Sequence, residues 1–507
     1  MLSTGNSPHR YAIWPPAYLL AWNGPLVTSL GLALALAAGL LLIQLTPLGG
    51  LLFVGLAALS VATAIEPLVG LAAALFLGPL WAYLRAEIPQ VPAQISQFFV
   101  ALTLAVWLAR GLARREIRLP NPLDNRTGSP LLPLLLFLGA ALLSLWDAVE
   151  LPVYGLPEFI KWVQILLLFL FVSDYLTPRR FPWLLGVLLV GGLFQAGVGV
   201  WQFGLRGAGP PHFAIPALGE RFYRAYGTFE QPNPYAGFLG LMLPLALGGV
   251  WGTAVSWWTK REKRADEWPR LSFYLLAAAA MLAALAMSWS RGAWLGAGAA
   301  LTVMALALPR RTRWGILLVV LLVGGGMGLY LAGLVPPSVA ARLTSFVNDV
   351  RFTDVRGVGI NDANYAVIER LAHWQAAWEM LRYNLWTGVG FGCYEPAYRD
   401  FALINWPIPL GHAHNFYLNI AAETGIIGLI AYLLLWGAVF WQTWRATRCT
   451  TGLLRGTALG LLGVWTHLSV HNALDNLYVN NVHLYVGALL GLLAWIVRSC
   501  RHTQSEL

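Results

Sequence analysis

The C-terminal third of the chain holds a short run of residues whose side chains can move protons. His412, His414 and Asn415 stand in "PLGHAHNFYLN", directly before an apolar run, and Glu423 follows about two helical turns inside that run. Imidazole is the side chain best suited to proton transfer near neutral pH, and an ionisable group inside an apolar membrane segment is costly enough to indicate function. His414 is therefore a candidate general base, with Asn415 as a hydrogen-bonding group. The alternative is that these residues cap the start of a helix.

Arginines beside other apolar runs offer a second kind of chemistry. They are Arg291 in the short joint "SWSRGAWLG", Arg221 and Arg224 in "GERFYRAYGTFEQPNPYAGFLG", and Arg370 in "IERLAHW". The planar guanidinium binds phosphate oxygens in a bidentate way, so together these residues favour a clamp for a phosphate at the depth of a lipid diphosphate. Each arginine also has a simpler interpretation, as an interfacial side chain, a solvated loop charge or a partner of Glu369.

A third group recurs along one predicted helix face. His467, His471 and Asp475 in "WTHLSVHNALDN" are spaced four residues apart, which places them on the same side of a helix, and such a spacing can bind zinc. No HExxH motif accompanies them, and an isolated HxxxH in an apolar helix is more often a contact between helices. We therefore expect neither a metal nor any other cofactor.

The composition indicates whether these residues act in water or in a membrane. Hydrophobic residues make up 58% of the 507 residues and charged residues only 11%, whereas soluble domains contain about half and about a quarter. The chain is therefore predicted to be an all-α polytopic membrane protein. Its net charge of +10 requires no nucleic acid, since cytoplasmic loops beside anionic lipids account for it.

The cysteines and the N-terminus argue against two further features. Cys393, Cys449 and Cys500 form no CxxC motif and no plausible disulfide framework, so we expect neither redox chemistry nor structural zinc. The first twenty residues carry no small-residue cleavage site after a short apolar core, so we predict no removable signal peptide.

Apolar stretches of roughly 17 to 25 residues predict about 12 to 14 transmembrane helices. The fourteen candidate centres lie near Leu34, Ala57, Leu75, Leu104, Leu138, Leu168, Val190, Met242, Ala283, Ala299, Val320, Leu429, Leu462 and Leu489. Basic clusters lie between spans at 109–118, 177–180, 259–264, 309–313, 444–448 and 498–501. If every cluster is cytoplasmic, the spans alternate without conflict and both termini lie in the cytoplasm.

The opposite, exoplasmic side then holds three segments, 205–233, 288–294 and 335–414. The last is too long for a simple connection, and such loops are usually functional. Apolar residues at helical spacing inside it predict an amphipathic helix that lies along the membrane surface. They are Val367, Leu371, Trp374, Trp378 and Leu381. The glycines of "TGVGFG" at 387–392 then predict a tight turn or a close approach of the backbone to a ligand.

Four of these stretches, in this order and separated by apolar spans, resemble the O-antigen ligase and polymerase superfamily. They are "RAYGTFEQPNPYAGFLG", "SWSRGAWLG", "ERLAHWQAAWEMLRYNLWTGVGFG" and "HAHNFYLNIAAETGIIGL". The resemblance is strong over residues 220–435 and rests elsewhere on the number of spans. The motifs are specific for the superfamily and do not distinguish its members.

The resemblance implies a glycosyltransferase of the bacterial inner membrane, with a fold related to the C class of these enzymes and a large helical exoplasmic loop. Such proteins take a glycan from an undecaprenyl diphosphate carrier on the periplasmic side. They join it to a hydroxyl of an acceptor saccharide, lipid-linked or of the lipid A core type, without a metal. The expected partners are therefore this donor, this acceptor and membrane lipids. A ligase and a polymerase share this chemistry, and the sequence does not separate them.

By motif, the resemblance assigns His414, Arg291 and Arg224 to catalysis. His414 would accept the proton of the acceptor hydroxyl, and the two arginines would neutralise the departing diphosphate, with inversion at the anomeric carbon. The residues assigned to substrate binding are Arg221, Arg370, His412, Asn415 and Glu423. The aromatic residues expected along the sugar path are Tyr394, Tyr398, Phe416 and Tyr417.

The predicted organisation has three parts. Transmembrane helices occupy 1–204, a ligase-like core with the loop 335–414 occupies 205–444, and further transmembrane helices with a cytoplasmic tail occupy 445–507. The count of about fourteen spans exceeds the twelve or so that are usual for the ligases. The alternative function is a membrane transporter of a small anion such as bicarbonate. Against transport, the sequence shows no obvious inverted repeat and no paired broken helices, and the candidate residues cluster at one surface.

Overall fold

A computed structural model of the chain describes residues 36, 39, 46–88, 91–115, 117, 130–259, 267–344, 354–361 and 364–505. Every regular element among them is helical, and β pairing is limited to one isolated bridge between Ala214 and Tyr223. The predicted all-α class is confirmed. The chain forms two compact units, Met1–Ala62 and Thr63–Leu507, and the site lies in the second. The division into three parts stays a prediction.

Most of the helices are apolar on all sides, as expected of helices surrounded by lipid or by one another. In chain order they are α2 (Pro47–Ile65), α3 (Pro67–Leu77), α4 (Trp81–Glu87), α5 (Ile95–Arg114), α6 (Leu131–Ser144), α7 (Leu156–Tyr175), α8 (Phe181–Val200), α9 (Pro232–Thr259), α10 (Glu267–Met287), α11 (Arg291–Ala307), α12 (Thr312–Leu331), α13 (Pro337–Thr344), α14 (Tyr365–Tyr383), α15 (Tyr394–Phe401), α16 (Phe416–Cys449), α17 (Gly452–Asn472) and α18 (Val482–Ser505).

Nine helices in the described ranges are long and apolar enough to cross a membrane. They contain the predicted centres Leu75, Leu104, Leu168, Val190, Met242, Ala283, Val320, Leu429 and Leu489. The centres Ala57, Leu138 and Ala299 lie in apolar helices of 10–17 residues, and Leu462 lies in α17. The centre near Leu34 and the expectation of no signal peptide fall outside the described residues. The prediction of a polytopic membrane protein is confirmed.

Small residues let α9 and α17 pack at backbone distance. A Cβ atom built on Gly248 would lie 2.1 Å from the carbonyl oxygen of Gly456, and one built on Gly456 would lie 2.1 Å from the oxygen of Gly248. Gly252 and Gly460 continue this close contact along the same pair of helices. Close approach through glycine is the usual way in which helices associate in a membrane. The α9 and α17 backbones are therefore in direct contact along these glycines.

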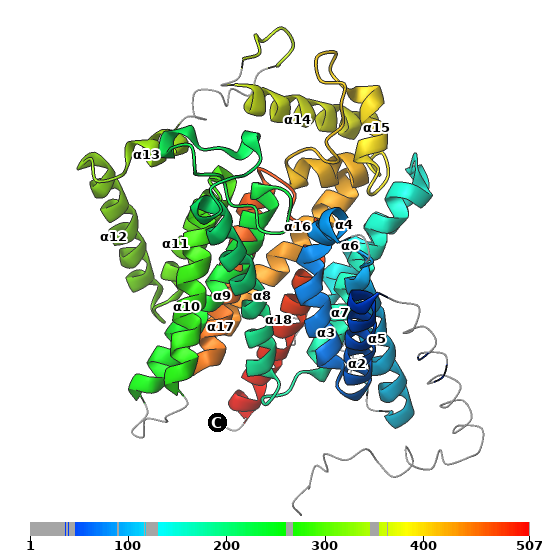
Figure 1. Cartoon of the computed structure of the whole chain (residues 1–507), viewed down its shortest axis with the longest axis vertical. Coiled ribbons are helices and arrows are strands. Elements are labelled where there is room, and N and C mark those ends of the chain that lie inside the picture. The colour runs from blue at the N-terminus through cyan, green and yellow to red at the C-terminus, as the bar shows by residue number, and fades with distance from the viewer. Residues whose placement is uncertain are drawn as a thin grey trace, which may run out of the picture. The chain divides into compact units, whose positions relative to one another are not determined.

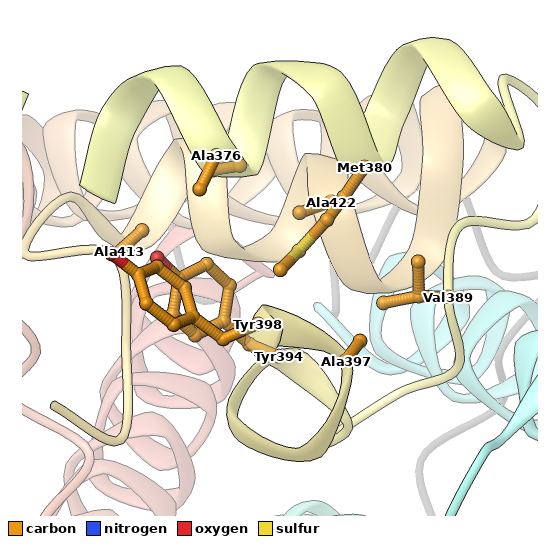
Figure 2. Close-up of a cluster of buried hydrophobic side chains, with 9 residues drawn as sticks. Ala376, Met380, Val389, Tyr394, Ala397, Tyr398, Ala413 and Ala422 are labelled. Atoms are coloured by element: carbon orange, nitrogen blue, oxygen red, sulfur yellow. The ribbon is translucent and has the colours of Figure 1, made fainter. Parts of the chain in front are cut away.

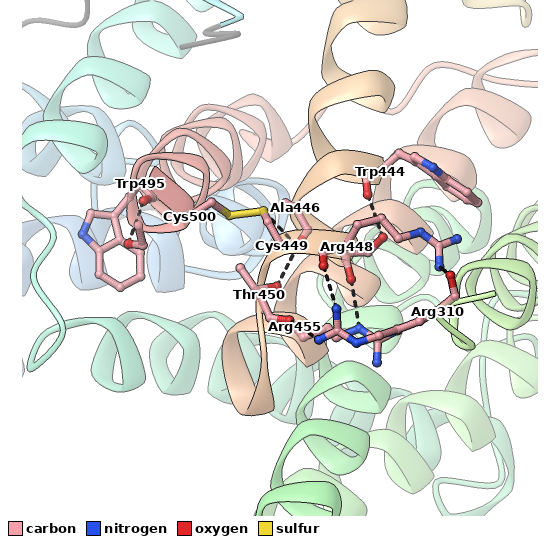
Figure 3. Close-up of a disulfide and its surroundings, with 11 residues drawn as sticks. Arg310, Trp444, Ala446, Arg448, Cys449, Thr450, Arg455, Trp495 and Cys500 are labelled. Carbon is pink, nitrogen blue, oxygen red and sulfur yellow. Dashed lines mark hydrogen bonds between the residues drawn. A yellow bond between two sulfur atoms is a disulfide. The ribbon is translucent and has the colours of Figure 1, made fainter. Parts of the chain in front are cut away.

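The two ends of the bundle differ in character. Within Thr63–Leu507, α14 lies across one end, and the C-terminus lies at the other (Figure 1). At this second end Arg310 Nη1 donates to the carbonyl of Arg448 at 2.8 Å (Figure 3). Nearby, Arg455 Nη2 donates to the carbonyl of Leu308 at 2.7 Å. The basic clusters 309–313, 444–448 and 498–501 therefore gather at the end opposite α14. The cluster at 259–264 lies largely outside the described residues.

The expectation that the cysteines form no disulfide is wrong. Cys449 in the last turn of α16 is bonded to Cys500 near the end of α18, with 5.6 Å between their Cα atoms (Figure 3). The two lie 51 residues apart in the sequence. Because α17 carries the chain to the other end and α18 returns it, the two cysteines meet only in the folded bundle. Cys393 is buried and remains a free thiol.

A helix is present at the predicted position as α14 and buries one face, but its apolar residues are not confined to that face. It packs on α15 and on the start of α16 through small and aromatic side chains (Figure 2). These are Ala376, Ala377, Met380, Val389, Tyr394, Ala397, Tyr398, Ala413 and Ala422. Val367, Leu371 and Leu381 of the predicted apolar stripe are buried, but Trp378 is 52% exposed. The stripe prediction is wrong there, because alanines rather than the second tryptophan make the buried face.

The predicted turn in "TGVGFG" follows α14 and wraps around α16. Gly388, Gly390 and Gly392 all have positive φ, at 70°, 102° and 79°. The amide nitrogens of Val389 and Gly390 donate to the carbonyls of residues 422 and 423, at 2.9 and 3.0 Å. A Cβ atom on Gly388 would lie 2.4 Å from the first of these carbonyl oxygens, so only glycine permits the approach. The turn thus fixes the loop after α14 to the N-terminal part of α16.

Candidate active site

A cavity of about 780 Å³ opens at the α14 end of the bundle, and four arginines line it. They are Arg224, Arg291, Arg342 and Arg370. We call this space the arginine cavity. Three of the four arginines were predicted as site residues, and the structure brings these three together from separate sequence motifs. Arg342 of α13 was not predicted, although an arginine on the side away from the basic clusters breaks the same charge bias that drew attention to Arg291.

Local structure holds each of these motifs in place. Arg224 donates from Nε to the carbonyl of Ser288 and from Nη2 to Asn233 Oδ1, both at 3.0 Å. The hydroxyl of Ser290, which precedes α11, donates to the same Asn233 oxygen at 3.0 Å. Arg342 donates from Nη2 to the carbonyl of Trp289 at 3.0 Å. The segments before α9 and before α11 are therefore joined around one asparagine.

The positive charges in the cavity are crowded and partly removed from water. Burial, followed by the charges of Arg342, Arg370 and Arg291, lowers the pKa of Arg224 to about 9. Burial and the charges of Arg291 and Arg370 likewise lower the pKa of Arg342 to about 10. Both side chains stay charged at neutral pH, and Arg370 Nε is buried without a hydrogen-bond partner among the described residues. A bound anion would relieve this repulsion, so the positive charge of the cavity favours binding of an anion.

Two predicted binding residues lie elsewhere. Arg221 is exposed, does not line the arginine cavity, and donates from Nη2 to the carbonyl of Gly204 at 3.1 Å. Glu423 is buried and lines neither the arginine cavity nor the neighbouring one described below. Its Oε1 accepts a hydrogen bond from the backbone nitrogen of Tyr394 at 3.2 Å, which ties α16 to α15. The geometry gives Glu423 a contact that supports the fold, and its role in binding substrate stays a prediction.

His414 faces Asp475, an aspartate that lines the arginine cavity, although His414 itself is not part of the lining. His414 Nδ1 lies 3.6 Å from Asp475 Oδ1, and His412 Nε2 lies 3.8 Å from the same oxygen. Neither ring nitrogen of His414 has a hydrogen-bond partner in the described part of the chain. Burial disfavours ionisation of Asp475, but the facing imidazole of His414 outweighs it and holds the pKa of the carboxyl well below its usual value. Asp475 is thus an ionised partner for His414.

Asp475 reaches this position by leaving the helix on which the sequence placed it. α17 ends at Asn472, so Asp475 does not continue the helical face of His467 and His471. Those two histidines lie close to each other, with 3.5 Å between His471 Nδ1 and His467 Nε2. A Cβ atom on Gly240 would lie 1.9 Å from the His467 ring, so this ring fills a gap left by a glycine of α9. The interpretation of His467 as a contact between helices therefore fits the structure.

The predicted residues next to His414 divide between capping and lining roles. Asn415 Oδ1 accepts hydrogen bonds from the backbone nitrogens of Tyr417 and Leu418, at 3.1 and 3.2 Å, so it is the N-cap of α16. Burial lowers the pKa of His412 to about 4, which leaves its ring neutral. Of the aromatic residues expected along a sugar path, Tyr417 lines a cavity. Tyr394, Tyr398 and Phe416 are buried side chains of the core and line neither cavity.

One group of potential metal ligands occurs in the described ranges. Its members are His412, His414 and Asp475, whose ligand atoms lie within 4.8 Å of one another. Two imidazoles and a carboxylate are donors that zinc accepts. The same spacing equally suits an imidazole oriented by a carboxylate, so the set fits a metal without requiring one. The expectation of metal independence stays a prediction.

The fold and this site define a polytopic helical membrane protein with an anion-attracting cavity and an adjacent histidine–aspartate pair at one end. Residues 276–433, just under a third of the chain, match the family model described as O-antigen ligase. The match confirms the resemblance of the sequence motifs to the O-antigen ligase and polymerase superfamily. No curated protein matches the chain. The family indicates an enzyme of glycosyltransferase type that acts on lipid-linked glycans in a membrane.

Proposed function

We propose that the protein transfers a glycan from an undecaprenyl diphosphate carrier to a hydroxyl of an acceptor saccharide. The observation that carries this proposal is the arginine cavity, where four guanidinium groups surround one space. Below the arginines the lining continues along α11 with Leu295, Gly298 and Ala299. A lipid diphosphate suits such a space, because its charged group meets the arginines and its chain meets an apolar helix face.

The arginines would stabilise the leaving group. Negative charge grows on the diphosphate as its bond to the anomeric carbon breaks, and fixed cations in a site shielded from water stabilise that charge strongly. Arg291 is also the first residue of α11, so the positive end of the helix dipole adds to its charge. Four arginines can thus do what a divalent cation does in many sugar-nucleotide enzymes, and the proposed reaction is metal-independent.

His414 would serve as the general base. With Nδ1 oriented by ionised Asp475, Nε2 is left to accept the proton of the acceptor hydroxyl. The hydroxyl oxygen then forms a bond to the anomeric carbon while the bond from that carbon to the diphosphate oxygen breaks. The electron pair leaves on the diphosphate, and attack from the opposite side inverts the anomeric configuration.

The distribution of charge supports an orientation. The basic clusters 309–313, 444–448 and 498–501 lie at the end opposite the arginine cavity, and such clusters face the cytoplasm in most membrane proteins. The proposed site would then face the periplasmic side of a bacterial inner membrane. Both termini would lie on the cytoplasmic side.

The test is transfer from synthetic undecaprenyl diphosphate oligosaccharides in detergent with a chelator. We expect wild type to release undecaprenyl diphosphate and form product, and His414→Ala and Arg224→Gln each to lose activity by at least about tenfold. Arg399→Gln is the matched control, because Arg399 lies at the same end of the bundle with its side chain 89% exposed. A ladder of products would indicate a polymerase, and a single addition a ligase.

Two results would count against the proposal. Full activity of His414→Ala would remove the proposed base. Uptake of bicarbonate or another small anion into proteoliposomes, lost in Arg224→Gln and accompanied by no glycan transfer, would favour the transporter instead.

A further inference from the structure

A second cavity, of about 770 Å³, adjoins the arginine cavity. Leu371 and Trp374 of α14 line both spaces, so these two side chains form a wall between them. The second cavity continues along α14 to Trp378 and is bounded on the other side by Asn415 and Tyr417 at the start of α16. We call it the tryptophan cavity.

His414 lines neither cavity, but its direct neighbours line one cavity each. The aspartate that faces it, Asp475, lines the arginine cavity, and the residue that follows it, Asn415, lines the tryptophan cavity. A transfer reaction needs a binding space for the donor and another for the acceptor, both close to the general base. This arrangement offers one space for each.

The lining of the tryptophan cavity suits a sugar ring. Trp374 and Trp378 are one helical turn apart on α14, so their indoles lie on the same side of the helix, and Trp378 is 52% exposed. Aromatic faces stack on the C–H faces of sugars, while planar amides and carboxylates bind pairs of hydroxyls. Gln375 and Glu379 supply an amide and a carboxylate beside the two indoles.

The charge of this cavity differs from that of its neighbour. Among the described residues that line it, the one arginine is Arg356, which is paired with Asp354, with 2.6 Å between Nη2 and Oδ2. Glu379 adds a negative charge. Arg382 Nη1 lies 3.3 Å from Glu379 Oε1, but both side chains are exposed, so this ion pair is weak. The tryptophan cavity therefore carries no excess of positive charge that would hold a diphosphate, and it disfavours acidic sugars.

We propose that the tryptophan cavity binds the terminal sugars of the acceptor saccharide, and that it selects neutral over acidic sugars. This inference rests on the proposed function, because it names the acceptor class of the same site. Trp378 is the main stacking surface, Glu379 sets the charge preference, and the wall of Leu371 and Trp374 separates the acceptor from the donor diphosphate.

The test measures steady-state transfer with donor and acceptor varied separately, using short neutral glycans as acceptors. In Trp378→Ala the acceptor KM should rise about tenfold or more, while the donor KM and the binding of inorganic diphosphate stay unchanged. Trp378→Phe should recover most of the loss. The control is Trp386→Ala, which removes an indole that is 64% exposed and lines neither cavity. Glu379→Lys should improve use of glycans that end in a uronic acid.

The other outcomes either overturn the assignment of the tryptophan cavity to the acceptor or test it separately from the proposed transfer function. A raised donor KM or weaker diphosphate binding in Trp378→Ala would assign the cavity to the donor, and an unchanged acceptor KM would deny it to the acceptor. If wild type transfers nothing, the proposed function fails, and the cavity is tested by saturation-transfer NMR with the same neutral glycans. A signal in wild type that Trp378→Ala loses would retain a saccharide site, and no signal in wild type would overturn it.

Discussion

The break in α16 provides the sharpest test of how the site is positioned. Gly425 has φ 64° and ψ −166° inside this helix, a conformation open essentially only to glycine. A Cβ atom there would lie 2.2 Å from the carbonyl carbon of Trp386, 2.3 Å from its oxygen and 2.6 Å from the nitrogen of Thr387. All three are backbone atoms, which cannot move aside as a side chain can. Gly425→Ala should therefore force the helix and the loop after α14 apart.

The expected cost follows from these contacts. The backbone strain amounts to about 1–3 kcal/mol. Separation also breaks the hydrogen bond from Ile426 N to the carbonyl of Leu385, at 2.9 Å, and weakens those that Val389 and Gly390 donate to the same helix, each contributing about 1 kcal/mol. The sum is roughly 3–5 kcal/mol. Because the segment before the break carries His414 and its cap, transfer activity should fall together with stability.

The assay is unfolding of the purified protein in detergent by heat and by SDS titration, with Gly437→Ala as the control. Gly437 lies in the same helix, and a Cβ atom built there meets nothing within 4 Å. That substitution should be neutral or stabilising by up to about 1 kcal/mol. Equal unfolding midpoints for Gly425→Ala and Gly437→Ala would refute the reasoning.

Three further outcomes are expected. Asp475→Asn should lower kcat by at least about tenfold with little change in either KM, because the amide no longer orients the imidazole of His414. A stopped assay with both substrates saturating measures kcat. A raised donor KM with a normal kcat would contradict this prediction. Diphosphate binding should weaken as the pH rises through about 9, because the protonated form of Arg224 holds the anion and its pKa is lowered to about 9; in Arg224→Gln that loss should be smaller when dissociation constants are compared across pH. The disulfide between Cys449 and Cys500 should be reduced in growing cells if the basic end faces the cytoplasm, since that compartment is reducing. Alkylation in lysates prepared with and without reductant should then give the same extent of labelling, and a difference would show an intact disulfide and place this end outside.

Several features of the fold could be predicted from the sequence because they depend on local composition. Apolar runs long enough to span a bilayer give helices wherever they occur, since backbone polar groups have no other partner in lipid. The glycines after α14 were recognised because a tight turn needs them. The buried face of α14 was partly misjudged, because Ala376 and Ala377 contribute little apolar character and Trp378 contributes much. Burial there depends on which helix lies opposite, and α16 follows only after the next loop.

The site shows the same division between residue types and their arrangement. Residue types and the charge bias of the loops were enough to select His414, Arg224, Arg291 and Arg370, because a histidine or an arginine beside a membrane span is costly without a function. The meeting of the three arginines around one cavity required the packing of α9, α11 and α14 and could not follow from spacing. The same holds for Arg342, for Asp475 beyond the end of α17, and for the disulfide between two helices that are separated by a third. The sequence by itself determined that the chain lies in a membrane, where its helices form, and which kinds of chemistry its side chains can perform. Only the tertiary structure decided which of these side chains face one another, because contacts between helices depend on close packing that no local pattern encodes.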